Sequence, residues 1–172
     1  RYTALMGTPN WFIALPCPGT GWYGALRAEM PAALCPFHPD DLHLTLAFLG
    51  ACGEASARAA WSVAVDRLEG WTPVASALGS IEPMGRPRRG TAFAAIPTTG
   101  WTALVAMMER VRADALDAAG APPDTRRPHP HVTVGRLRRT DAAGRRDALE
   151  WCASRGDPGV PVGFDAAALY TW

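Results

Sequence analysis

Lysine is missing from this sequence: all 17 basic residues are arginine, and 16 acidic residues reduce the net charge to +1. A net charge this small indicates no particular class of binding partner. We interpret the absence of lysine as codon usage in a GC-rich genome, which the abundance of alanine, glycine and proline also indicates. The alternative is a functional reason, because arginine binds phosphate groups through paired hydrogen bonds.

Long hydrophobic runs and a signal-peptide pattern are missing as well, so we expect a cytoplasmic protein without membrane contact. The four cysteines form no C-x-x-C pair and no zinc spacing, which predicts reduced thiols (Cys17, Cys35, Cys52 and Cys152). Neither a G-x-x-x-x-G-K loop nor a G-x-S-x-G turn occurs. These absences argue against nucleotide-driven ligation and against a serine hydrolase.

The remaining pattern mixes helices and strands within one domain spanning residues 1–172, of which 1–9 are expected to be a loose extension. Hydrophobic periodicity and Gly/Pro breaks predict helices at 22–30, 54–69 and 100–119, with Gly120 as a stop, and a further helix from Thr140. Strands are predicted at 11–16, 42–50, 72–81, 90–97, 131–137 and 162–172, with 35–41 as a break. Because helices followed by strands occur twice, the order indicates an α+β protein with two similar halves.

Two short segments repeat a pattern that can support chemistry: HLTLAFLG begins at His43, and HVTVGR begins at His131. Side chains two apart on a strand share one face, so His43 and Thr45 should form one polar pair, and His131 and Thr133 another. The opposite faces should anchor the strands in the core (Leu42, Leu44, Leu46 and Phe48 in the first segment; Val132 and Val134 in the second). Either pair alone is better explained as the solvent-facing side of an antiparallel strand, or as a histidine that is hydrogen-bonded within the core. The matched repetition instead favours a site built from both pairs.

Two histidines suit the opening of a cyclic phosphodiester, which needs a base for the attacking hydroxyl or water and an acid for the departing oxygen. With an ordinary pKa of about 6.5, one imidazole can be neutral while the other is charged. Threonine hydroxyls and an arginine can bind the non-bridging oxygens as negative charge develops. Such a site requires no metal and no cofactor.

The two segments resemble the paired H-x-T motifs of the two-histidine (2H) phosphoesterases. Further segments resemble one branch, the bacterial RNA 2′,3′-cyclic phosphodiesterases, also called 2′-5′ RNA ligases (WFIALP, PDDLHLTLAFLG, PMGRPRRG and RPHPHVTVGR). The resemblance covers about residues 10 to 170 in element order. It implies two pseudo-symmetric lobes, each an antiparallel sheet backed by helices, with one motif per lobe facing a central cleft.

The same resemblance implies hydrolysis of an RNA 2′,3′-cyclic phosphate end, or of a cyclic nucleotide, to a 2′-phosphate. ATP-independent 2′-5′ joining to a 5′-hydroxyl often accompanies this reaction. It further implies His43 as the acid at the leaving 3′-oxygen, His131 as the base and Arg136 as a phosphate ligand. An ideal strand would turn Arg136 away from His131, so its role requires a bulge or strand end at Gly135. We expect a monomer.

Several alternatives accompany this hypothesis. A metal site could form around His38, Asp40, Asp41 and His43, or around His129 and His131, although neither set has a recognised ligand spacing. The arginines at 86, 88, 89, 126 and 127 could form a rim for RNA phosphates or an ordinary solvated turn. Stacking on a base is conceivable for Trp11, Trp22 and Phe37, for which core packing is the better interpretation. The chain could also act on 2′-5′ oligonucleotides or a small cyclic phosphate ester, or bind RNA ends without turnover.

Overall fold

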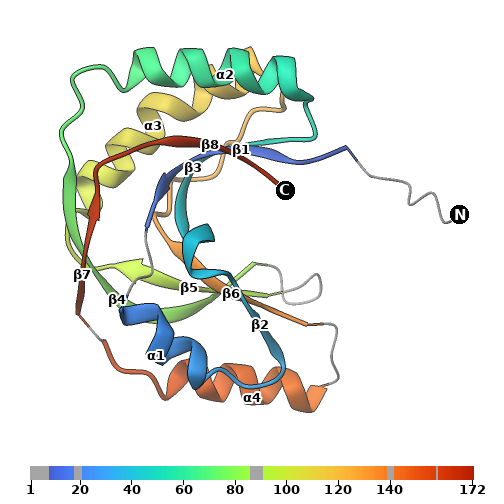
Figure 1. Cartoon of the computed structure of the whole chain (residues 1–172), viewed down its shortest axis with the longest axis vertical. Helices are drawn as coiled ribbons and strands as arrows, with labels where there is room; N and C mark the ends of the chain where they lie inside the picture. The colour runs from blue at the N-terminus through green and yellow to red at the C-terminus, as the bar shows by residue number, and fades with distance from the viewer. Residues whose placement is uncertain (1–7, 18–20, 86–90, 139–141, 158) are drawn as a thin grey trace, which may run out of the picture.

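A computed structural model describes residues 8–17, 21–85, 91–138, 142–157 and 159–172. Within these residues the chain is α+β, with an eight-stranded antiparallel sheet and α-helices on its outside (Figure 1). The strands are β1 (Trp11–Pro16), β2 (Leu34–Pro36), β3 (His43–Gly50), β4 (Val74–Met84), β5 (Ala92–Pro97), β6 (Val132–Leu137), β7 (Val160–Phe164) and β8 (Ala168–Thr171). The helices are α1 (Trp22–Ala28), α2 (Glu54–Arg67), α3 (Trp101–Ala118) and α4 (Ala142–Ala153), with a 3₁₀ turn at Pro39–Asp41. Among the described helices, none is long and apolar enough to cross a membrane.

The sheet consists of two similar halves that meet at the two motif strands. Its order is β7-β4-β5-β6-β3-β1-β8, with β2 also paired to β6, so β3 and β6 are central neighbours. Helices α2 and α3 pack on each other and on β1 and β3, whereas α4 packs on β4. Figure 1 shows α1 beside α4 on the other side of the molecule from α2 and α3. Two pseudo-symmetric lobes were predicted from the family resemblance, and this arrangement confirms them.

Helix α3 illustrates how the sequence positions a motif strand. It starts after Gly100, where φ is 71° and an added Cβ would lie 2.9 Å from the carbonyl oxygen of Ala75. Glycine is therefore required at this position. The helix ends as predicted at Gly120, with the Ala121 N–H donating to the Leu116 carbonyl at 2.9 Å. Its buried residues cover the core side of β3.

Two expectations about strands are wrong. The single strand predicted at 162–172 is divided between the end of β7, which begins at Val160, and β8. These strands pair with β4 and β1 at opposite ends of the sheet order. The polar residue Asp165 and the two alanines after it interrupt the alternation, so the chain changes partner there. The predicted break at 35–41 contains part of β2, a strand of three residues that is too short to show a period. Residues 1–7 of the expected N-terminal extension, the arginines at 86, 88 and 89, and the expected helix start at Thr140 lie outside the described residues.

Candidate active site

The two motif strands meet side by side through the antiparallel pair Leu44 and Val132. Both of these side chains are completely buried, so they anchor β3 and β6 in the core. Their sequence neighbours therefore project from the opposite face of the sheet, where all four are half-buried (His43, Thr45, His131 and Thr133).

The register also determines which of these polar groups are neighbours. In an antiparallel ladder centred on the Leu44 and Val132 pair, His43 lies across from Thr133, and Thr45 lies across from His131. The two histidines are then diagonal neighbours, for which Cα atoms are typically about 7–8 Å apart. Each imidazole thus lies across the strand pair from the threonine of the other motif, in a two-fold arrangement.

A bulge follows the threonine in β3 and changes which side chains face the site. Ile13 pairs with Ala47 while Ala14 pairs with Thr45, so Leu46 is an extra residue. Leu46 and Ala47 are consequently both buried, and Phe48 is 48% exposed. The prediction that Phe48 anchors the core is therefore wrong, because the bulge moves it to the face that carries His43.

The same kind of bulge follows the threonine in β6. Phe93 pairs with Gly135 while Ala94 pairs with Thr133, which leaves Val134 as the extra residue. Arg136 is exposed as a result and projects from the same face as Thr133. A Cβ at Gly135 would lie 3.1 Å from the Cys35 carbonyl oxygen, so the close approach of β2 also favours glycine there.

Both motif histidines are held by the same local hydrogen bond. Nδ1 of His43 lies 2.6 Å from the carbonyl oxygen of Asp41, and Nδ1 of His131 lies 2.6 Å from that of His129. A carbonyl oxygen can only accept, so each Nδ1 carries the proton and donates it. Nε2 is consequently the atom that accepts a proton in the neutral ring and that gives one up from the charged, doubly protonated ring.

Burial lowers the pKa of both imidazoles, because desolvation disfavours the charged ring. For His43, the Asp41 carbonyl and carboxylate partly offset this, while the charges of His131 and Arg136 lower the pKa further. For His131, the His129 carbonyl offsets the effect of burial, while the His129 ring and Arg126 add to it. Each histidine is therefore readily neutral near pH 7, and each has its own set of neighbouring charges.

Aromatic rings surround His43. The ring centroids of Phe12 and Tyr170, from β1 and β8, lie 4.6 Å and 5.2 Å from that of His43. Phe12 and Tyr170 are themselves stacked, with an interplanar angle of 10°. Because strands β3, β1 and β8 are adjacent, these side chains share one face of the sheet.

An open pocket of about 460 Å³ continues from this aromatic group. Two of the predicted residues, His43 and Arg136, line it together with Phe12, Phe37, Tyr170 and Trp172. The Arg136 guanidinium carbon lies 5.6 Å from the Trp172 ring centroid and 5.8 Å from that of Phe37. Trp172 is 54% exposed and its ring lies 5.9 Å from that of Phe48. The pocket therefore offers apolar faces beside a fixed positive charge.

The other residues considered from the sequence have different surroundings. Trp11, Trp22 and Phe37 are half-buried and pack against the core, and only Phe37 also lines this pocket. Arg126 forms an ion pair with Asp124 at 2.8 Å, while Arg127 is exposed. The arginines at 86, 88 and 89 lie outside the described residues.

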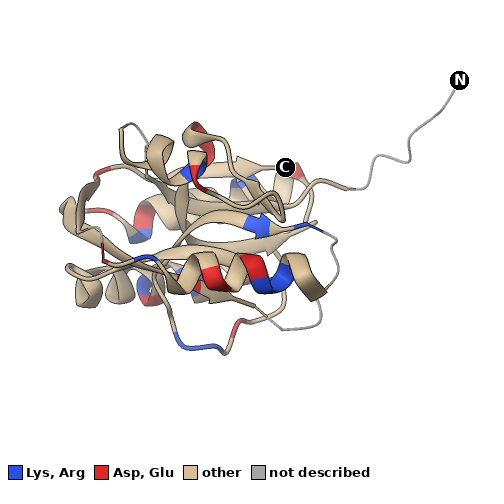
Figure 2. Cartoon of the chain, turned by 90° about the horizontal axis from the view of Figure 1, so that it is seen from below, with Lys and Arg blue, Asp and Glu red and all other residues tan. Residues whose placement is uncertain are grey.

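The proposed metal-ligand sets are not assembled in the part of the chain that the structure describes, where no group of three or more His, Cys, Asp and Glu side chains could hold an ion. All four cysteines are free, and burial raises the pKa of Cys17 to about 12. Acidic and basic residues are interspersed along the helices and loops (Figure 2). The site is therefore distinguished by its histidines and aromatic rings rather than by a large charged surface.

Three aromatic residues of the pocket were not found as site candidates from the sequence: Phe12, Tyr170 and Trp172. Tyr170 and Trp172 are two residues apart, which is the spacing of side chains that share a strand face. Recognising them would have required the pairing of β8 with β1, which brings Tyr170 opposite Phe12. That pairing joins the two ends of the chain and leaves no local signal.

Comparisons with known proteins agree with this geometry. The family model of the 2′-5′ RNA ligase superfamily matches residues 21–172.

Solved structures share the fold. The structure of E. coli LigT complexed with ATP is 25% identical, with a TM-score of 0.63 over 95% of this chain and 87% of that one. A Thermus thermophilus protein, TT0787, shares the fold at 21% identity, with a TM-score of 0.64 over 93% of this chain and 86% of that one. Kluyveromyces marxianus Usb1 shares it at 11% identity, with a TM-score of 0.58 over 94% and 96%. No curated protein sequence matches the chain. The family match covers most of the chain and both motifs, and the chain belongs to the 2′-5′ RNA ligase superfamily.

Proposed function

We propose that this chain is a metal-independent phosphodiesterase that opens the 2′,3′-cyclic phosphate at RNA ends to a 2′-phosphate. The observation that carries the proposal is the matched pair of imidazoles on adjacent strands, each with Nδ1 bound to a main-chain carbonyl and Nε2 available. Two such groups can act as acid and base in one reaction. We further propose that the enzyme works as a monomer in the cytoplasm, without a cofactor.

In the proposed reaction, Nε2 of His131 takes a proton from water, which attacks phosphorus and forms the new P–O bond. His43 enters this step as the charged imidazolium, with a proton on both ring nitrogens. The bond from phosphorus to the 3′-oxygen breaks, and the Nε2 proton of His43 passes to that oxygen, which leaves His43 neutral. The hydroxyls of Thr45 and Thr133 donate to the non-bridging oxygens, and Arg136 stabilises the charge that develops there. With a 5′-hydroxyl end in place of water as the nucleophile, the same groups would form a 2′-5′ bond without ATP.

The aromatic surroundings support a nucleotide as the substrate. Tyr170, beside His43, and the exposed Trp172 line the same pocket, while the buried Phe12 packs against both of their rings. Accessible aromatic rings of this kind stack on bases. E. coli LigT, at 24% identity and a TM-score of 0.63, has been crystallised with 3′-AMP. A phosphate held by the two motifs would leave the attached nucleoside within reach of these rings.

Replacing either motif histidine by alanine tests the proposal. We expect His43→Ala and His131→Ala each to lower the hydrolysis of a 2′,3′-cyclic mononucleotide by about 10²–10⁴-fold, the usual contribution of a general acid or base. Circular dichroism should show an unchanged fold, since both side chains stand on the half-buried face. His129→Gln serves as the matched control because the carbonyl of residue 129 remains available to Nδ1 of His131. It is compared with the unaltered protein at alkaline pH, where His131 is neutral with or without the His129 charge.

Three outcomes contradict the mechanism: undiminished turnover in either histidine variant, loss of turnover on adding a chelator, or a 3′-phosphate as the product. A module that only binds RNA ends would show affinity without turnover in the unaltered protein. Comparing a cyclic mononucleotide with a 2′-5′ oligonucleotide distinguishes the proposed substrate from that alternative.

A further inference from the structure

A tyrosine hydroxyl from helix α1 contacts the backbone of the second motif. Tyr23 is completely buried, and its hydroxyl lies 2.5 Å from the carbonyl oxygen of Val134 and 3.0 Å from that of Phe37. Val134 is the extra residue of the bulge in β6, two positions before Arg136. Phe37 lies in the segment that leads to His43. Tyr23 therefore connects the bulge of the second motif to the approach of the first.

Helix α3 makes the mirror connection. Nε of Arg112 donates to the carbonyl oxygen of Leu46 at 3.4 Å, and Nη1 donates to that of Arg126 at 3.0 Å. Leu46 is the extra residue of the bulge in β3, directly after Thr45. Arg126 lies in the loop that leads to His131. Arg112 therefore connects the bulge of the first motif to the approach of the second.

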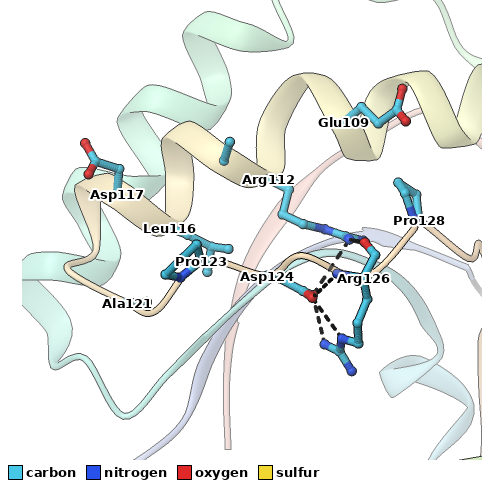
Figure 3. Close-up of a pocket in the computed structure, with 10 residues that line it drawn as sticks. Glu109, Arg112, Leu116, Asp117, Ala121, Pro123, Asp124, Arg126 and Pro128 are labelled. Carbon is cyan, nitrogen blue, oxygen red and sulfur yellow. Dashed lines mark hydrogen bonds and ion pairs between the residues drawn. The ribbon is translucent and has the colours of Figure 1, made fainter.

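The Arg112 side chain is only 13% exposed and lies 3.7 Å from the Asp124 carboxylate (Figure 3). Arg126, which hydrogen-bonds the same carboxylate, lowers the pKa of Asp124 to about 2, so that partner stays charged. The loop before His131 is in this way attached to helix α3 by both a carbonyl and a carboxylate.

The two connections correspond in the pseudo-symmetric lobes, because α1 and α3 are the helices that follow β1 and β5. We propose that Tyr23 and Arg112 are positioning residues, which fix the separation and orientation of the two histidines by linking each bulge carbonyl to the segment entering the opposite motif. This inference rests on the proposed phosphodiesterase function for its kinetic consequences.

The interface between the motif strands explains why such links matter. Among the described residues, the ladder between β3 and β6 comprises the single pair Leu44 and Val132. One ladder pair constrains the relative rotation of two strands weakly compared with the longer registers elsewhere in this sheet. A displacement of about 1 Å between catalytic groups can cost up to about 100-fold in rate. The pairing of β2 with β6 and the Phe37 N–H bond to the Val134 carbonyl already hold the approach to the first motif against β6. Tyr23 and Arg112 add links from both helices that restrict the remaining freedom.

Two conservative variants test the proposal. Tyr23→Phe removes only the hydroxyl, and Arg112→Met removes the guanidinium but keeps an apolar stem. We expect each to lower kcat for a cyclic mononucleotide by about tenfold, with KM changed less than about threefold, since positioning affects the reaction more than binding. Arg112→Lys should restore part of kcat, because an ammonium can reach one of the two carbonyls but not both.

Matched controls separate positioning from stability. Ser76→Ala removes a side-chain hydrogen bond to a carbonyl, that of Thr99 at 2.6 Å, without touching either motif. Arg110→Met removes a guanidinium from the same helix, whose one hydrogen bond among the described residues is to the Glu69 carbonyl at 3.3 Å. Ser76→Ala should lower Tm comparably to Tyr23→Phe, yet both controls should keep kcat within about twofold. Equal kcat values in the controls and the Tyr23 and Arg112 variants would overturn the proposal.

Histidine titration by NMR provides a second measurement that does not depend on turnover. The Tyr23 and Arg112 variants should shift the imidazole pKa values of His43 and His131 upward from their lowered values, because looser motifs admit water. Unchanged titrations together with unchanged kcat would overturn the positioning role. If the unaltered protein failed to open cyclic phosphates, the titration shifts alone would decide this inference, and only the proposed function would fall.

Discussion

The two motif strands have nearly the same backbone but different surroundings. Each has a histidine bound to the carbonyl two residues earlier, a threonine on the same face, and a bulge directly afterwards. After the bulge, the first strand presents Phe48 and the second presents Arg136. His43 lies among the rings of Phe12 and Tyr170, whereas His131 lies beside a second histidine, with ring centroids 6.1 Å apart.

This comparison indicates how a symmetric frame supports an asymmetric reaction. The shared backbone gives two imidazoles with equivalent Nε2 atoms, and nothing in that geometry distinguishes an acid from a base. The difference comes from neighbouring side chains: an exposed aromatic ring on one strand, and a cation at the equivalent position of the other. We infer that the second strand supplies the charge that binds phosphate, while the first supplies apolar contacts to the nucleoside.

The largest expected difference in kcat/KM is between variants of Arg136 and of Phe48, the residues that the two strands present after their bulges. Arg136→Met should lower kcat/KM for a cyclic mononucleotide by about 100-fold, because it removes a charged donor from the developing charge on phosphorus. Phe48→Leu should change the same constant by less than about threefold. Steady-state kinetics of both variants measure this contrast.

Arg136→Lys is the control for charge, and it should recover only part of the activity because an ammonium cannot donate two parallel hydrogen bonds. Arg136 is exposed, so a loss of folding is not expected to confuse the measurement. Similar small effects on kcat/KM at both positions would contradict the inference that the second strand supplies the charge that binds phosphate.

The threonines should show a smaller and more symmetric effect. Thr45→Val and Thr133→Val keep the side-chain shape and each remove one hydrogen bond to an anionic phosphate oxygen, which is worth about 1.5 kcal/mol at the low end of the range for charged acceptors. We expect kcat/KM to fall about tenfold in each variant. A clearly larger loss at one threonine would identify the motif whose hydroxyl is closer to the non-bridging oxygens, and no loss at either would contradict the phosphate-binding role.

Most of the fold and the two polar pairs could be predicted because they depend on local periodicity. Alternation along β3 and β6 predicts that His43 and Thr45 share a face, and the burial of Leu44 and Val132 agrees with it. Alternation fails where a bulge adds a residue, which is why Phe48 was assigned to the wrong face. A bulge depends on the register with a neighbouring strand, and that register is not contained in one segment.

The side chains around the site depend on longer-range contacts still. Tyr23 reaches Val134 across 111 positions, and Arg112 reaches Leu46 across 66. Tyr170 becomes a neighbour of His43 only because β8 pairs with β1 at the end of the sheet. None of these residues carries a short motif, so their roles follow from topology rather than from local pattern.

The smallest expected effect concerns the charges that distinguish the two histidines. Burial lowers the pKa of both rings most, and the charge of the His129 ring lowers that of His131 further, whereas the charged neighbours of His43 are Asp41, His131 and Arg136. His129→Gln should therefore raise the pKa of His131 slightly, with the effect of burial retained, and leave that of His43 nearly unchanged. NMR titration of the two imidazoles measures both values in one experiment.

The sign of the kinetic consequence follows from the same shift. If His131 is the base, it must be neutral, so a higher pKa keeps it protonated to a higher pH and moves the acidic limb of kcat/KM upward. If His131 were the acid, the basic limb would move upward instead, because the required proton would be retained longer. A shifted basic limb would reverse the assigned roles of the two histidines, and a titration change at His43 instead of His131 would contradict the separation of their surroundings.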